Sequence, residues 1–167
     1  QGKVRFIGVS INDHEPDTAL DLIRSGWVDT LQVIYNIFDQ SPSQNLIPLA
    51  QQYNIGILAR CPLDEGSLSG QLRTDTVFPQ NDWRRDYFRG DRLRETVERA
   101  QRLNFLIRDE IQTLSQAALK FCLSHPAVST VIPGMRRTEH VEANCAVSGP
   151  PPLPPEKRAA LKEHAWA

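Results

Sequence analysis

Apolar positions along the chain follow two spacings, one typical of strands and the other typical of helices. Short runs rich in β-branched residues predict strands over residues 4–9, 30–35, 55–60 and 128–132. Apolar residues three or four positions apart predict helices over residues 16–26, 43–53, 91–103, 109–124, 138–147 and 156–166. Because helices follow the strands, the pattern predicts an α/β fold with a parallel sheet, about four βα units and a C-terminal helix.

Two stretches interrupt this alternation. Residues 66–91 are mostly polar and contain Gly66, Gly70 and Pro79, so we expect a long loop there, and long loops often have a functional role. A proline-rich linker over residues 150–155 precedes the terminal helix. The 167 residues are 40% hydrophobic and 23% charged, which predicts one domain with its own core over residues 1–167.

Two architectures fit this order of elements, a doubly wound sheet and half of a (βα)8 barrel. Doubly wound nucleotide-binding sheets usually have a glycine-rich phosphate turn, but neither GxGxxG nor GxxxxGK[ST] occurs in the chain. The TIM-barrel family is therefore favoured, with this chain forming a half-barrel. The chain has no initiator Met and becomes apolar by its fourth residue, so we expect a fragment of a longer protein.

Charge and cysteine content narrow the range of partners. The formal net charge is −1, so the chain has no overall basic field to attract nucleic acid or an anionic membrane, and no apolar run reaches the roughly 18 residues of a membrane span. Residues 81–90 interleave basic and aromatic side chains, as single-strand-binding proteins do, but the acidic residues among them favour a folded loop. Cys61, Cys122 and Cys145 match no disulfide framework or zinc spacing, which predicts reduced thiols in a cytoplasmic protein.

Candidate binding residues follow the predicted strands, where the active sites of barrels are found. Ser10 can bind an uncharged polar group or cap a helix, and Gln32 can serve as a core hydrogen-bonding group or a ligand contact. The small, polar loop of residues 60–70 is suited to wrapping a pyrophosphate with backbone N–H groups. Arg136 and Arg137 precede a predicted helix, so they form either a phosphate site or a solvated loop.

Groups for acid–base catalysis are scarce. The four histidines lie in predicted loops or at exposed helical positions: His14, His125, His140 and His164. Cys61 has no evident base beside it in the sequence, so a cysteine-nucleophile hydrolase has no further support.

The order and spacing of these clusters resemble the aldo-keto reductases, specifically the bacterial branch with long loops, over essentially the whole chain. Residues 2–10 resemble that family's fifth strand, 32–36 its sixth, 59–68 its seventh and 123–134 the approach to its eighth. The resemblance implies the C-terminal half of an NADP-dependent reductase that converts aldehydes or ketones to alcohols. It also implies that the family's catalytic Asp, Tyr, Lys and His lie upstream, so that this chain alone is inactive.

The resemblance further implies a set of cofactor-binding residues. Ser10 and Gln32 would bind the nicotinamide carboxamide, and Arg60 stands where many members stack an aromatic side chain on the nicotinamide ring. The pyrophosphate and ribose would lie along Cys61, Leu63, Gly66, Ser67 and Leu68. The adenosine 2′-phosphate and adenine would be surrounded by Gly134, Met135, Arg136, His140 and Asn144. No metal site is implied.

Partners and alternatives follow from the missing units. The complete enzyme would act on a small carbonyl compound, and an N-terminal half would complete the barrel. A second possibility is a non-catalytic half-barrel that pairs with itself or a partner through the open edges of its sheet. A third is a cofactor-binding or regulatory module without catalysis.

Overall fold

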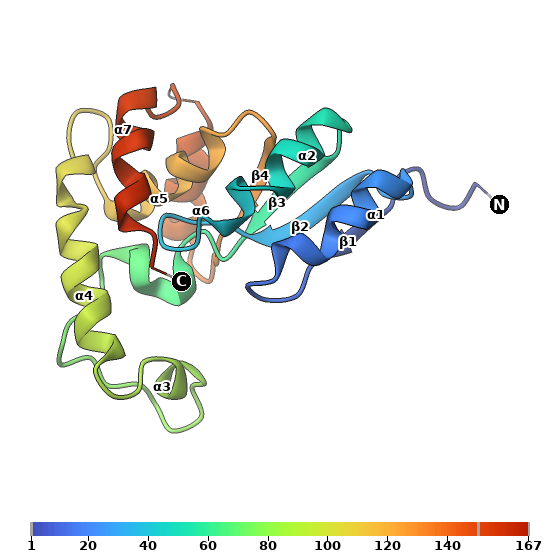
Figure 1. The fold of residues 1–167 in the computed structure, drawn as a ribbon. Coiled ribbons are helices and arrows are strands. Elements are labelled where there is room, and N and C mark those ends of the chain that lie inside the picture. Colours follow the sequence, from blue (N-terminus) through green and yellow to red (C-terminus); the bar gives the residue numbers. More distant parts are fainter. Residues whose placement is uncertain (1, 150, 167) are drawn as a thin grey trace.

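A parallel four-stranded sheet runs through the computed structural model, which describes residues 2–149 and 151–166 (Figure 1). Its strands are β1 Gly8–Ser10, β2 Thr30–Ile34, β3 Gly56–Arg60 and β4 Val128–Ile132. They lie side by side in chain order, without the reversal of order that marks a doubly wound sheet. This arrangement is the one expected of consecutive units of a (βα)8 barrel.

Helices follow each strand, and some of them bury one face of the sheet. They are α1 Leu20–Ser25, α2 Leu46–Gln52, α3 Arg84–Tyr87, α4 Arg92–Arg102, α5 Leu114–Leu123, α6 Thr138–Cys145 and α7 Pro155–Ala160. The core packs alternate residues of the strands, such as Leu31 and Ile57, against apolar helix residues such as Ile47 and Ala118. Within the described part of the chain, no helix is long and apolar enough to span a membrane.

The opposite face of the sheet presents rows of residues set by the strand register. These rows are Gly8–Thr30–Gly56, Ser10–Gln32–Leu58–Thr130 and Ile34–Arg60–Ile132. A Cβ atom at Gly8 would clash with Thr30 Oγ1, so a larger residue there requires the Thr30 side chain to move. Ser10, Gln32 and Arg60 thereby come to lie toward the carboxyl end of one sheet face.

Several elements are shorter than the sequence predicts. The strand predicted over residues 4–9 is formed only at Gly8–Ser10, because its pairing with β2 begins at Gly8, and Val4 and Phe6 upstream remain 70% and 69% exposed. Helix α5 begins at Leu114 rather than at 109, because Thr113 and Gln116 form a capping box at its start. The predicted stripe of Leu114, Ala118, Phe121 and Cys122 is buried in this helix, whereas Ile111, predicted to belong to it, lies before the helix begins.

The long loop and the C-terminus also differ from their predicted form. The loop over residues 66–91 contains the end of a 3-10 turn, Asp64–Ser69, and the short helix α3. The terminal helix ends at Ala160 and continues as a 3-10 turn, after which Trp166 donates its backbone N–H to the Phe38 carbonyl (2.7 Å). The ends of the predicted domain, residues 1 and 167, and the first linker residue, 150, lie outside the described residues.

Candidate functional site

Ser10 and Gln32, predicted to bind a carboxamide, lie next to each other on neighbouring strands. The strand register pairs them directly, and Gln32 Nε2 donates a long hydrogen bond of 3.4 Å to Ser10 Oγ. Gln32 is only partly buried and lies on the sheet face that the helices leave open, so it is not a core hydrogen-bonding group. A hydroxyl and an amide at this spacing can exchange hydrogen bonds with one uncharged polar ligand group.

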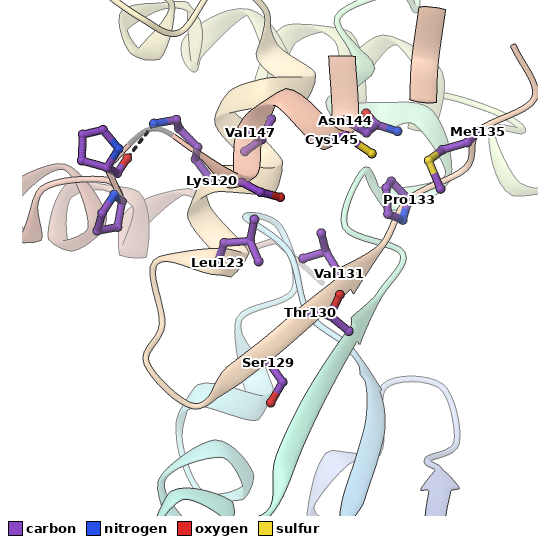
Figure 2. Close-up of a pocket in the computed structure, with 13 residues that line it drawn as sticks. Lys120, Leu123, Ser129, Thr130, Val131, Pro133, Met135, Asn144, Cys145 and Val147 are labelled. Carbon is purple, nitrogen blue, oxygen red and sulfur yellow. Dashed lines mark hydrogen bonds between the residues drawn. The ribbon is translucent and has the colours of Figure 1, made fainter. Parts of the chain in front are cut away.

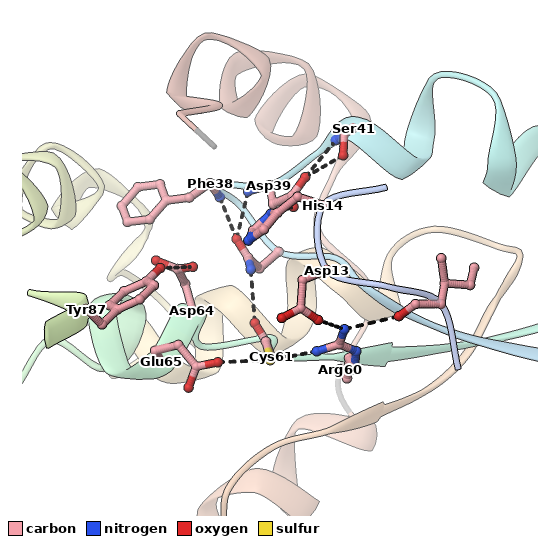
Figure 3. Close-up of polar contacts among 12 residues, drawn as sticks. Asp13, His14, Phe38, Asp39, Ser41, Arg60, Cys61, Asp64, Glu65 and Tyr87 are labelled. Atoms are coloured by element: carbon pink, nitrogen blue, oxygen red, sulfur yellow. Dashed lines mark hydrogen bonds and ion pairs between the residues drawn. The ribbon is translucent and has the colours of Figure 1, made fainter. Parts of the chain in front are cut away.

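Arg60 ends β3 and ties it to the loop after β1 (Figure 3). Its Nη2 donates to the Ile11 carbonyl (3.2 Å) and forms an ion pair with Asp13. The hydrogen bond and charge of Arg60 lower the pKa of the Asp13 carboxyl. The guanidinium is 21% exposed and its charge is already paired, so its planar face, rather than its net charge, is what it offers a ligand.

The loop that follows β3 has an unusual backbone. Cys61, Asp64, Glu65 and Gly66 all have positive φ angles, of 49°, 44°, 54° and 104°. Non-glycine residues adopt this conformation at a cost, and such residues cluster at ligand-binding sites. The surrounding structure holds the loop in place, since Asn36 Nδ2 donates to the Cys61 carbonyl (3.0 Å) and Cys61 Sγ donates to Glu65 Oε1 (3.2 Å).

Burial raises the pKa values of a thiol and a carboxyl group in this loop. Burial, together with the hydrogen bond to Glu65 and the charge of Glu65, raises the pKa of the Cys61 thiol to about 11. The thiol is therefore protonated at neutral pH, which argues against a cysteine nucleophile. Burial also raises the pKa of Asp64, whose carboxylate accepts a hydrogen bond from the Tyr87 hydroxyl (3.3 Å).

A cavity of about 300 Å³ lies between the loops that follow β3 and β4. Six of the predicted cofactor-binding residues line it: Cys61, Leu63, Gly66, Gly134, Arg136 and His140. Its remaining lining residues are Pro62, Glu65, Arg84 and Ile132. Ser67 and Leu68, the other two residues predicted for this loop, are only 1% and 0% exposed and do not line the cavity.

The long loop contributes a cation that the sequence reasoning did not single out. A second cavity, of about 470 Å³, shares Glu65, Arg84 and Arg136 with the first and is otherwise lined by residues of the segment 79–83. Arg84 binds the Asp82 carboxylate with two nitrogens, at 3.0 and 2.6 Å. Arg84, with a smaller contribution from Arg136, lowers the pKa of Asp82 to about 2. The basic and aromatic tract that contains Arg84 was the available signal, and it predicted only a folded loop.

Met135 and Asn144 lie apart from the other predicted residues. They line a different cavity, of about 520 Å³, between β4 and the helices α5 and α6 (Figure 2). The Asn144 Nδ2 atom is buried and has no hydrogen-bond partner within the described residues. The residues predicted to surround the adenosine end are therefore divided between two hollows.

Two histidines are less exposed than the sequence predicts. His125 is half-buried because the terminal segment packs over the end of α5, and burial, together with the charge of Arg158, lowers its pKa. His164 lies in the terminal 3-10 turn with its ring 6.0 Å from that of Phe105. Unlike His140, neither of them lines the cavity between the β3 and β4 loops.

Comparison with known proteins identifies the family. The sequence profile of the Aldo/keto reductase family matches residues 1–165. This chain belongs to the aldo/keto reductase family. It is 24% identical over 146 residues to the NADH-specific methylglyoxal reductase of Escherichia coli K12, covering 87% of this chain and 44% of that relative. It is 26% identical over 152 residues to the Bacillus subtilis aldo-keto reductase YhdN, covering 89% and 45%.

Solved aldo/keto reductase structures share the fold. The glycerol dehydrogenase AKR11B4 from Gluconobacter oxydans superposes with a TM-score of 0.80 at 23% identity, over 98% of this chain and 49% of that chain. The holo form of AKR11C1 from Bacillus halodurans gives 0.74 at 23% identity, over 99% and 52%. The chain spans about half the length of these relatives. The predicted α/β fold of the TIM-barrel family is thus confirmed, with four parallel strands in this chain.

Proposed function

We propose that this chain is the NADP(H)-binding half of a cytoplasmic reductase that converts aldehydes or ketones to alcohols. The observation that supports this most is the cavity between the β3 and β4 loops, where Arg136 and Arg84 lie beside a loop whose residues Asp64, Glu65 and Gly66 all have positive φ angles. Strained loops of this kind are frequent at ligand-binding sites, and arginine binds phosphate through paired hydrogen bonds.

The polar groups at the strand ends fit a nicotinamide nucleotide. Ser10 and Gln32 match the donors and acceptors of a carboxamide, and Arg60 offers a planar face at the neighbouring strand end. The Nε of Arg60 is buried without a hydrogen-bond partner among the described residues, so this site has unused polar capacity. When bound, the nucleotide supplies a hydride to the carbonyl carbon.

The proton for the developing alkoxide has to come from outside this chain. A tyrosine that acts as this acid needs a lowered pKa, whereas burial raises the pKa of Tyr87 to about 12 and raises the pKa of Tyr35 as well. Tyr53 is exposed at the end of α2, just before the amino end of β3, whereas the site lies at the carboxyl ends of the strands. We therefore propose that the catalytic groups lie on an N-terminal half and that this chain alone has no turnover.

A preference for NADP(H) over NAD(H) rests on Arg136. Asp82 neutralises Arg84, whereas Arg136 forms no ion pair within the described residues and lines both cavities. An unpaired cation beside the nucleotide would favour the additional phosphate of NADP(H). A relative of this chain is named as NADH-specific, so the preference has to be measured directly.

Nucleotide binding and complementation test the proposed function. NADPH should quench the tryptophan fluorescence of the chain at lower concentration than NADH does. The chain alone should not oxidise NADPH in the presence of an aldehyde, and addition of the N-terminal half of a related reductase should restore this activity. Absence of NADPH binding, or absence of turnover in a complex that forms, would contradict the proposal.

The surface favours an N-terminal half as the partner that completes the barrel. Apolar side chains are exposed along both outer strands, Val9 on β1 and Ile132 on β4. Each of these strands pairs with only one neighbour among the described residues. Sedimentation separates this proposal from self-pairing, because a stable dimer of the chain alone would favour the non-catalytic alternative.

A further inference from the structure

A separate polar pocket of about 330 Å³ lies where the terminal helix α7 packs beside α5 (Figure 1). Its wall includes Tyr35, Ser43, Phe121, His125, Arg158 and Lys162. None of its lining residues lines the cavities described above. The pocket is therefore distinct from the proposed nucleotide site.

The pocket contains two cations and no acidic lining residue. Arg158 and Lys162 lie four residues apart on the terminal segment, and neither forms an ion pair within the described ranges 2–149 and 151–166. Glu163, next to Lys162, instead lies 3.8 Å from His164. Like charges at this spacing repel each other, so an anion between them would stabilise the segment.

The Tyr35 hydroxyl adds a neutral donor to the pocket wall. Tyr35 is only 4% exposed, with its ring centroid 5.3 Å from that of Phe121 and edge-on to His125. The hydroxyl makes no hydrogen bond with another described residue and is not among the fully buried unpaired polar atoms, so it is accessible to a ligand in the pocket. Burial raises the pKa of Tyr35, so the hydroxyl keeps its proton and donates.

His125 is held in the tautomer that donates from Nε2. Its Nδ1 accepts a hydrogen bond from the backbone N–H of Ala127 (3.2 Å), and an accepting Nδ1 places the proton of a neutral imidazole on Nε2. Burial and the charge of Arg158 keep the pKa of His125 below its ordinary value, so the neutral form prevails at pH 7.5. The titratable groups of this wall therefore all present donors.

We propose that this pocket binds a small oxyanion of the phosphate class, held by Arg158 and Lys162 with the Tyr35 hydroxyl as a third donor. Arg158 also donates to the Ser124 carbonyl at the end of α5, so a phosphate here would fasten the terminal helix to the body of the domain. The cavity is larger than a phosphate ion, and the rings of Tyr35 and Phe121 can accept an attached organic group. Inorganic phosphate and phosphate monoesters both satisfy this chemistry.

Calorimetry and thermal unfolding of the nucleotide-free chain test the proposal. Titration with inorganic phosphate and with phenyl phosphate at constant ionic strength should give saturable binding and a higher Tm, whereas chloride should give neither. Tighter binding of phenyl phosphate would identify a monoester as the preferred form. Both Lys162→Ala and the near-isosteric Tyr35→Phe should weaken phosphate binding by about tenfold, the effect of one lost hydrogen bond to a charged group.

Two matched variants distinguish this pocket from other basic surfaces. Lys157→Ala removes the same charge from the same terminal segment outside the pocket, and Arg136→Ala removes the cation of the nucleotide site. Neither substitution should change the affinity of the phosphate binding that Lys162→Ala weakens. Equal weakening by Lys157→Ala and Lys162→Ala, equal stabilisation by chloride, or no binding of either phosphate compound would overturn the proposal. Lys162 is exposed, so its variant keeps the fold and gives a decisive result.

Discussion

Replacement of Arg136 by alanine probes the basis of nucleotide preference. The side chain is exposed, lines both loop cavities and lies two residues before the start of α6. A hydrogen bond to a charged group contributes roughly 1.5–3 kcal/mol when it is lost, and solvent exposure favours the lower end of this range. About 1.4 kcal/mol corresponds to a tenfold change in Kd. We therefore expect Arg136→Ala to weaken NADPH binding by about 10- to 30-fold.

The assay is a fluorescence titration of the chain with NADPH and with NADH. NADH lacks the 2′-phosphate, so its Kd should change by less than about twofold, within the scatter of surface substitutions. Arg137→Ala is the matched control, because Arg137 has the same charge, is exposed and lines neither cavity. Equal losses for the two nucleotides would place Arg136 at the pyrophosphate instead. An unchanged NADPH affinity would remove it from the site and refute the reasoning.

Three further changes test the fold and its pH dependence. Thr113→Ala removes the acceptor of the Gln116 backbone N–H (3.2 Å) and should lower the free energy of unfolding by about 1 kcal/mol in urea, whereas Thr113→Ser should not. Gly8→Ala should lower the free energy of unfolding by about 1–3 kcal/mol through overpacking against Thr30, and adding Thr30→Ala should restore most of this loss. If the effects of the two substitutions simply add, the clash between these two residues is refuted as the cause. Because the native pKa of His125 is below its ordinary 6.5, the unfolded state binds more protons near that pH. Stability should thus fall as pH drops below about 6.5, and His125→Gln should flatten that slope in urea denaturation between pH 5 and 8.

Local patterns were sufficient for three strands. Residues Thr30–Ile34, Gly56–Arg60 and Val128–Ile132 lie within the predicted runs, since a β-branched or apolar run between turn residues has few other stable conformations. The first predicted strand formed only in part. Residues 4–7 have the right composition, but a strand also needs a paired neighbour, and β2 begins opposite Gly8.

The candidate site was partly predictable because parallel strands bring their carboxyl ends to one edge. This placed Ser10 beside Gln32 and brought Gly134 and Arg136 to the loop after β3. Arg84 was not predictable in this way. It lies far along the chain from Arg136, and only the path of the long loop brings the two guanidinium groups to a shared cavity.

By itself, the sequence determined the α/β alternation, the absence of a doubly wound phosphate turn and the family, because these depend on spacing within short segments. Tertiary structure decided which predicted residues share a cavity. Met135 lies next to Gly134 in the chain yet lines a different hollow, and Leu68 is buried beneath the loop it belongs to. Packing between segments distant in sequence sets where each side chain points, and no local spacing encodes that outcome.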